Sequence, residues 1–204
     1  MPMAFAQRVP AVNEPIPIDR RAADNLRYIR DTMERAASFT AVPGWGGVLI
    51  GISALGAGVL AFGFPLHTQF FIWMAESVVA LAIAAWAVRS KSKRMVQSLQ
   101  SKPARRALLS FVPPLAVGAV LTAVLYQADF LRVVPGLWLL LYGAAVVTGG
   151  AFSVRIVPVM GLCFMALGVV SLLSPAMWGD VFLALGFGVT HIIFGIAIAR
   201  RHGG

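Results

Sequence analysis

The sequence is poor in charged residues and has a single cysteine. Charged side chains make up 12% of its 204 residues, whereas a soluble domain carries about 25%. The apolar residues gather in long uncharged runs, and this distribution excludes a soluble globular core. The one cysteine, Cys163, excludes an intramolecular disulfide and a metal site built from cysteines.

Several functional signals are also missing from the sequence. The first 17 residues contain no apolar signal-peptide core, so we expect the first membrane span to direct insertion itself. The chain has no HExxH, CxxC, GxSxG or phosphate-loop pattern. We therefore expect no enzyme activity, catalytic residue, metal ion or cofactor, although an acid–base pair inside the membrane would escape a motif search.

What the chain does have is six apolar runs of membrane-spanning length. A transmembrane helix needs roughly 20 apolar residues, and six spans use most of the chain. The fold class we predict is therefore all-α, a polytopic membrane protein of six transmembrane helices. The predicted spans cover residues 44–63, 69–88, 107–126, 133–152, 156–174 and 181–199.

The basic residues lie almost entirely on one side of these spans. The formal net charge is +9, but its placement argues against a nucleic-acid partner. Of the 17 lysines and arginines, Arg132 alone falls on the opposite side. This asymmetry follows the positive-inside rule, so we expect both termini in the cytoplasm and the protein in a bacterial inner (plasma) membrane.

The segment before the first span divides in two. Residues 1–17 contain four prolines and predict a flexible tail. Residues 18–41 place one apolar stripe opposite a charged face, which predicts an amphipathic helix. It either lies on the cytoplasmic leaflet or docks a membrane-protein partner or a second copy of this chain. Residues 42–204 then form the transmembrane domain.

The largest hydrophilic piece between predicted spans is the loop 89–106. It is basic and contains no acidic residue, so we expect it to contact anionic lipid headgroups, at about 1 kcal/mol per basic residue near the surface. The residues assigned to this contact are Arg89, Lys91, Lys93, Arg94, Lys102, Arg105 and Arg106.

The spans form three similar hairpins. A shift of 45 residues places Val112-Pro113 on Val157-Pro158 and Arg155 on Arg200, and the first hairpin matches more loosely. Small residues allow close helix approach in lipid. The glycines assigned to helix packing are Gly47, Gly51, Gly143, Gly150, Gly188 and Gly195.

The tandem hairpins and glycine-spaced stretches such as GLCFMALGVVSLLSP resemble the HdeD-like family of six-span bacterial membrane proteins with short repeats. The resemblance covers the last four spans best. It implies a three-hairpin fold and a role in acid or other stress, and the family offers no catalytic motif to transfer.

Two polar residues within the predicted spans are Glu76 and His191. A charge inside the bilayer costs about 2.5–3.5 kcal/mol on insertion scales, so it marks a functional hypothesis. Gly188, His191 and Gly195 have the spacing of one helical face. We predict that spans 2 and 6 are adjacent and that Glu76 and His191 share a polar pocket. The pair is a structural clamp, a proton-responsive or transport site, or a cofactor or metal site.

Two functional hypotheses follow. The first is a non-enzymatic membrane protein with an interaction, structural or stress-related role, whose cytoplasmic helix contacts lipid or a partner. The alternative is a small proton-coupled transporter or pH-responsive protein that uses Glu76 and His191. A water-filled path to these two residues favours the alternative, and a dry bundle weakens it.

Overall fold

A computed structural model of the chain describes residues 24–29, 43–94 and 101–202. The chain divides into two compact units, Met1–Ala37 and Ser38–Gly204. In the first unit, residues 24–29 are helical and exposed, and they belong to the helix predicted over 18–41. The predicted tail 1–17 and the remainder of 18–41 lie outside the described residues.

The second unit contains six helices long and apolar enough to cross a membrane, and its described residues include no strand. The predicted fold class, an all-α polytopic membrane protein, is confirmed. The first five spans consist of α2 (Gly44–Ala61), α3 (Leu66–Arg94), α4 (Lys102–Gln127), α5 (Val134–Gly150) and α6 (Ile156–Leu173). A 3₁₀ turn, η1 (Leu131–Val133), precedes α5.

The sixth span is composite. It begins with the 3₁₀ turn η2 (Ala176–Trp178) and continues through α7 (Gly179–Leu183), the π-helix η3 (Ala184–Thr190) and α8 (His191–His202). The sequence predicts its start at residue 181, whereas the apolar helical stretch starts at Ala176. Asp180 therefore lies on the helix, although the predicted span begins one residue after it.

The basic loop predicted over 89–106 is shorter in the structure, because α3 continues to Arg94 and α4 begins at Lys102. Lysine and arginine are good helix formers, so α3 continues past its apolar part. The start of α4 is capped by Ser101, whose Oγ accepts a hydrogen bond from the Ala104 backbone N–H at 3.4 Å. Most of the predicted headgroup residues therefore lie on helix ends.

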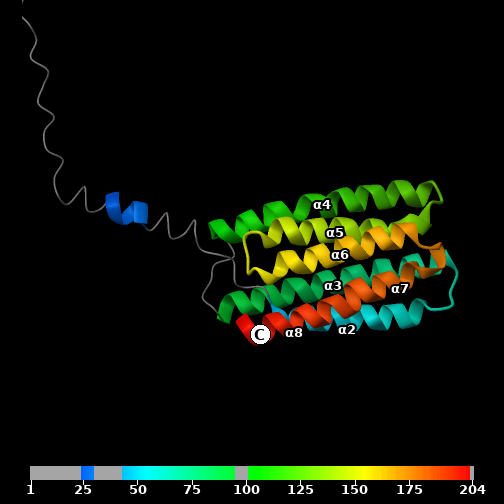
Figure 1. Ribbon diagram of the computed structural model, residues 1–204, viewed down its shortest axis with the longest axis horizontal. Helices are drawn as coiled ribbons and strands as arrows, with labels where there is room; N and C mark the ends of the chain where they lie inside the picture. The colour runs from blue at the N-terminus through cyan, green and yellow to red at the C-terminus, as the bar shows by residue number, and fades with distance from the viewer. Residues whose placement is uncertain (1–23, 30–42, 95–100, 203–204) are drawn as a thin grey trace, which may run out of the picture. The chain divides into compact units, whose positions relative to one another are not determined.

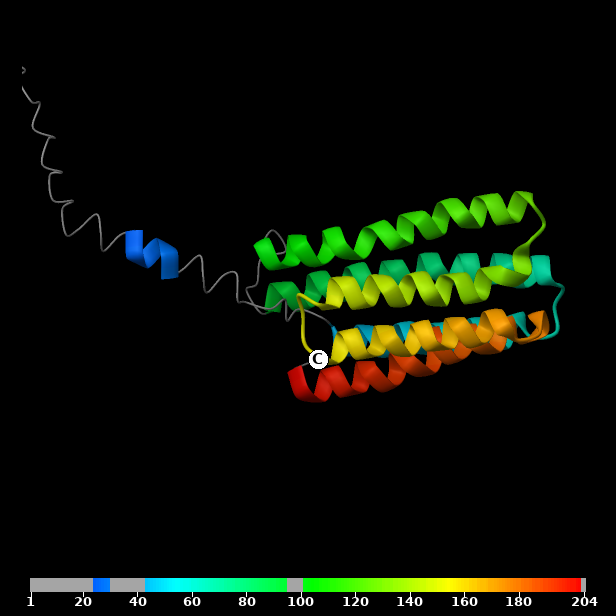
Figure 2. The same ribbon diagram turned by 45° about the horizontal axis from the view of Figure 1, so that its top comes forward.

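The spans run side by side, and the short outer turns lie at the opposite end from the C-terminus (Figure 1). Helix α5 packs against both α4 and α6, and α2 packs against α3 and α8. Both views show α4, α5 and α6 as successive neighbours (Figure 2). Helices α3 and α4 are the most exposed, with 11% of each apolar window buried against 44% in α2.

Two of the helix contacts are packed through glycine. Between α2 and the sixth span, a Cβ added at Gly51 would lie 2.6 Å from the carbonyl oxygen of Gly188. Between α5 and α6, a Cβ added at Gly143 would lie 2.7 Å from the carbonyl oxygen of Gly161. Both distances are far inside van der Waals contact, so glycine allows the backbones to approach.

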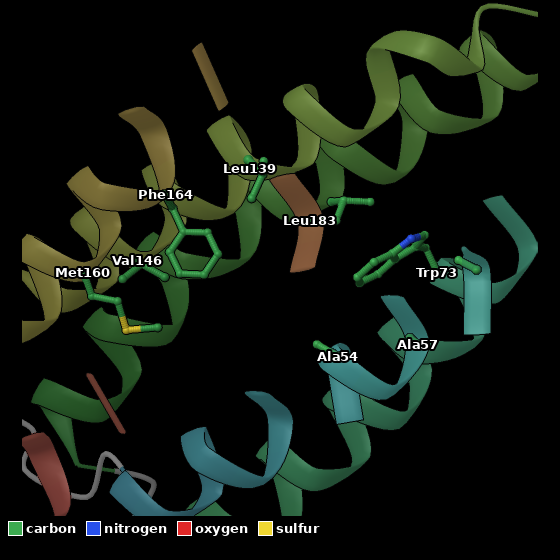
Figure 3. Close-up of a cluster of buried hydrophobic side chains, with 9 residues drawn as sticks. Ala54, Ala57, Trp73, Leu139, Val146, Met160, Phe164 and Leu183 are labelled. Carbon is green, nitrogen blue, oxygen red and sulfur yellow. The ribbon is translucent and has the colours of Figure 1, made fainter. Parts of the chain in front are cut away.

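A buried apolar cluster joins the spans. Figure 3 shows Ala54 and Ala57 of α2 with Trp73 of α3, and Leu183 of α7 between them and residues of α5 and α6. Phe164 is fully buried in this cluster. Large apolar side chains on the outer faces of the helices are exposed, as expected for a surface that faces lipid.

Candidate functional site

A cavity of about 350 Å³ lies inside the six-helix unit. Residues from α2, α3, α4, α5 and the sixth span line it. The lining is mainly apolar, and ligand pockets of about 300–1,000 Å³ with a few placed polar groups are typical small-molecule sites. Six aromatic side chains line this cavity, namely Phe70, Trp73, Phe111, Trp138, Tyr142 and Phe187.

The cavity reaches the surface beside α3. Ser77 and Leu81 both line it, and Leu81 is also 68% exposed. A side chain that borders a cavity and is exposed on the bundle surface marks the mouth of that cavity. Since Phe111 and Leu115 of α4 also line the space, the mouth lies where α3 and α4 face the membrane.

Glu76 lies on this cavity and is held by the neighbouring helix. The hydroxyl of Ser53 on α2 donates a hydrogen bond to Oε1 of Glu76 at 2.7 Å. Ser53 Oγ also lies 3.0 Å from the backbone oxygen of Ile50 in its own helix. The second carboxyl oxygen of Glu76 has no hydrogen-bond partner among the described residues, so it is available to a ligand or water.

Asp180 is a second carboxylate on the same cavity. The indole Nε1 of Trp73 donates a hydrogen bond to Oδ1 of Asp180 at 2.8 Å. This bond joins α3 to the sixth span. Trp73 lies three residues before Glu76, on the same face of α3. Since Trp73 holds Asp180, the carboxylates of Glu76 and Asp180 border the same part of the cavity.

His191 lies at the inner part of the same cavity and is 4% exposed. Its Nε2 is 2.8 Å from the hydroxyl oxygen of Tyr142 on α5. The backbone carbonyl groups of Gly186 and Phe187, in the turns just before His191, lie near its ring. Nδ1, however, has no hydrogen bond of good geometry in the described part of the chain. Because carbonyls can only accept, this arrangement favours the tautomer with a proton on Nδ1 and Tyr142 as the donor to Nε2.

The helix just before His191 is a π-helix. The hydroxyl of Thr190 bonds the carbonyl oxygen of Leu185, five residues earlier, at 3.0 Å. Such wide turns are rare and frequently occur at functional sites. The wider turn also changes the predicted face: Gly188 and Gly195 pack against α2, whereas the His191 ring packs against Tyr142 and Phe164.

Glu76 and His191 therefore border one cavity, but each is hydrogen-bonded to a different residue. Spans 2 and 6 meet through the side chains of Trp73 and Asp180, and α2 packs against both spans. Among the described residues no hydrogen bond or ion pair joins Glu76 to His191. A direct pairing of the two side chains stays a prediction.

The other predicted site residues lie in two places. All six glycines assigned to packing lie where a Cβ would fall 3.4 Å or less from a neighbouring helix. Among the basic residues, Lys91 is buried, and the side chain of Arg94 lies outside the described part. The exposed members of the predicted headgroup set are Arg89, Lys93, Lys102, Arg105 and Arg106.

Three cavity residues were not singled out from the sequence as site residues: Trp73, Tyr142 and Asp180. Trp73 lies near the start of the predicted span 69–88, where an interfacial aromatic residue is common, and Asp180 lies just before the predicted span 181–199. The spacing of Trp73 and Glu76 at i, i+3 was the available signal for a shared face. The partners of Tyr142 and Asp180 depend on which helices become neighbours, and sequence spacing does not carry that information.

Among the described residues, no three histidine, cysteine, aspartate or glutamate side chains lie together as a metal site would require. No known protein family, no curated protein and no solved structure matches the chain. The family comparison therefore gives no support to the resemblance to HdeD-like proteins.

Proposed function

We propose that this chain is an integral membrane protein that binds a small, membrane-soluble molecule in its interior, as a small carrier or receptor. The six spans make it a membrane protein. The observation that supports the binding role is the cavity of about 350 Å³ that Glu76, Asp180 and His191 border. Ionisable residues within membrane spans are costly, and by default they mark a functional site.

This proposal follows the transporter alternative more closely than the purely structural hypothesis. An internal cavity at Glu76 and His191 is what a proton-coupled or pH-responsive transporter requires. The separate hydrogen bonds of the two residues suit a site in which Glu76 meets the ligand while Tyr142 orients His191. No catalytic role is assigned to either residue.

The test of this proposal is whether solutes reach the cavity. In a Cys163→Ser background, a single cysteine is placed at Ala84, which lines the cavity, and another variant carries it at Ala145, which is fully buried in the helix packing. The label is a membrane-permeant, uncharged maleimide, because the mouth of the cavity faces lipid; it reacts with the thiolate form of cysteine. We expect rapid labelling of the Ala84→Cys protein in membrane vesicles and none at Ala145. Equal protection of both thiols would contradict an accessible cavity.

A second candidate function is an interaction role for residues 18–41, with lipid, a membrane-protein partner or a second copy of this chain. What supports it is the exposure of Leu26 and Ile29, 67% and 52%, on the described helical part of this segment. Exposed apolar side chains beside charged ones suit a membrane surface or a protein groove. Native-membrane cross-linking of the full chain and of a chain lacking residues 1–41 tests this role, and identical cross-link patterns would contradict it.

A further inference from the structure

The polar groups of the cavity are unequal in charge. Glu76 and Asp180 contribute two carboxyl groups, and Arg132 is the one lysine or arginine that lines the cavity within the described part of the chain. Arg132 is exposed, and its guanidinium carbon lies 4.6 Å from the ring centroid of Phe130 at the outer turn. The outer end of the cavity therefore has a cation that already contacts an aromatic ring, while the rest of the lining has carboxylates and no lysine or arginine.

Both carboxylates are positioned but not neutralised by the protein. Ser53 holds one oxygen of Glu76, and Trp73 holds one oxygen of Asp180. Within the described residues neither carboxylate has an ion pair or a second hydrogen bond. An unpaired carboxylate inside a membrane is costly unless it is protonated or meets a positive charge. Because two such groups border one cavity, a positively charged occupant would stabilise both of them.

The rest of the lining has the chemistry that holds an organic cation. Trp73, Trp138 and Tyr142 are among the aromatic residues around the cavity, and the faces of aromatic rings attract quaternary and other organic cations. His191 also lines the cavity and is 4% exposed, but Tyr142 contacts its Nε2 and the backbone of its own helix lies at its Nδ1, so the inference rests on the carboxylates and the aromatic lining.

The position of the cavity mouth limits which molecules can enter. Because the opening beside Ser77 and Leu81 lies on faces of α3 and α4 that meet the membrane, a molecule must partition into lipid to enter there. A small inorganic cation does not partition into lipid, and its oxygen-rich coordination shell is absent from an aromatic lining. A bulky cation with an apolar surface satisfies both the mouth and the carboxylates.

We propose that the cavity binds a lipophilic organic cation, with Glu76 and Asp180 as its counter-charges and the surrounding aromatic rings as its walls. This inference rests on the proposed function, since it names the ligand class of the same cavity. A neutral or anionic ligand in the cavity would contradict the cation proposal but would leave the binding role intact.

The experiment compares two probes of the same shape and opposite charge, tetraphenylphosphonium and tetraphenylborate. Equilibrium dialysis of the purified full chain in detergent, with protein-free micelles as the blank, gives the affinity for each. We expect saturable binding of tetraphenylphosphonium, and affinity for tetraphenylborate at least tenfold lower. Glu76→Gln and Asp180→Asn should each weaken tetraphenylphosphonium binding at least tenfold.

The matched control is Asp129→Asn, which removes the same charge at the outer turn, where Asp129 lies 3.3 Å from His67 and does not line the cavity. It should leave the affinity unchanged. If Glu76→Gln does not fold, the Asp180→Asn variant and the comparison of the two probes on the unmodified chain still test whether the cavity prefers a cation. Equal or tighter binding of tetraphenylborate, or carboxylate variants that behave like Asp129→Asn, would overturn the cation inference.

The labelling experiment separates the two failures. If neither probe binds and Ala84→Cys is still labelled, the cavity is accessible and only the cation inference is wrong. If neither probe binds and Ala84→Cys is protected, the binding role itself is wrong as well.

Discussion

At the scale of single residues, the three ionisable groups Glu76, Asp180 and His191 each have one side-chain partner from another helix. Ser53 reaches Glu76 from α2, Trp73 reaches Asp180 from α3, and Tyr142 reaches His191 from α5. Hydrogen bonds of this kind contribute about 0.6 kcal/mol on average between membrane helices. They orient the side chains more than they stabilise the fold.

The partner assignments predict which pairs are energetically coupled. In a double-mutant cycle with Tyr142→Phe and His191→Leu, unfolding in detergent should show a coupling of about 0.5 kcal/mol or more, because the two side chains share a hydrogen bond. A cycle with Glu76→Gln and His191→Leu should be additive to within about 0.5 kcal/mol, because no shared partner joins them. Strong coupling in the second cycle would instead support the direct pairing of Glu76 with His191.

At the scale of helices, glycine decides which spans come close. The sixth span lies against α2 at Gly51 and Gly188, and α6 lies against α5 at Gly161 and Gly143. The apolar effect gives little net attraction between helices in lipid, so association depends on close packing. These contacts hold the bundle around the cavity, while the more exposed α3 and α4 border its mouth.

Two glycines on the same helix provide a matched test of this packing. A Cβ at Gly51 would lie 2.6 Å from a backbone oxygen of the sixth span, whereas a Cβ at Gly56 meets nothing within 4 Å. We expect Gly51→Ala to destabilise the protein by about 1–3 kcal/mol through overpacking. Gly56→Ala should be neutral or stabilising by up to about 1 kcal/mol through helix propensity. Equal thermal stability of the two variants in detergent would argue against the packing described for α2.

At the scale of the whole molecule, the asymmetric charge sets an expected orientation. Sixteen of the 17 lysines and arginines fall on the side of the two termini, and Arg132 falls at the other end. The structure has both ends of the six-span unit at one side of the bundle, consistent with an even number of spans (Figure 1). On the positive-inside rule, we expect the termini in the cytoplasm.

Reporter fusions test this orientation. Fusions at Gln69, Asp129 and Gly179 should report a location outside the cytoplasm, and a fusion at Ser98 should report the cytoplasm. The three outer turns together contain one lysine or arginine, and the positive-inside rule predicts that turns poor in these residues lie outside the cytoplasm. Fusions truncated after each span serve as controls for insertion. One reversed result among the four positions is incompatible with six spans in this orientation.

The sequence by itself determined the membrane class and the six helices. Every backbone polar group must be satisfied inside lipid, so an apolar run of roughly 20 residues has few alternatives to a helix. It also pointed to residues that prove to lie at close contacts or on the cavity, such as Gly51, Gly188, Glu76 and His191. These signals are local, because hydropathy and residue type are properties of a single segment.

Only the tertiary structure decided what those residues meet. The cavity exists because five spans surround it, and the structure gives Glu76 a hydrogen bond from Ser53 and places Tyr142 at His191. The start of the sixth span at Ala176 brings Asp180 onto a helix and to the cavity. The π-helix before His191 turns the ring toward Tyr142. Each of these outcomes depends on which helices pack together, and packing is fixed by the shapes of all the faces at once.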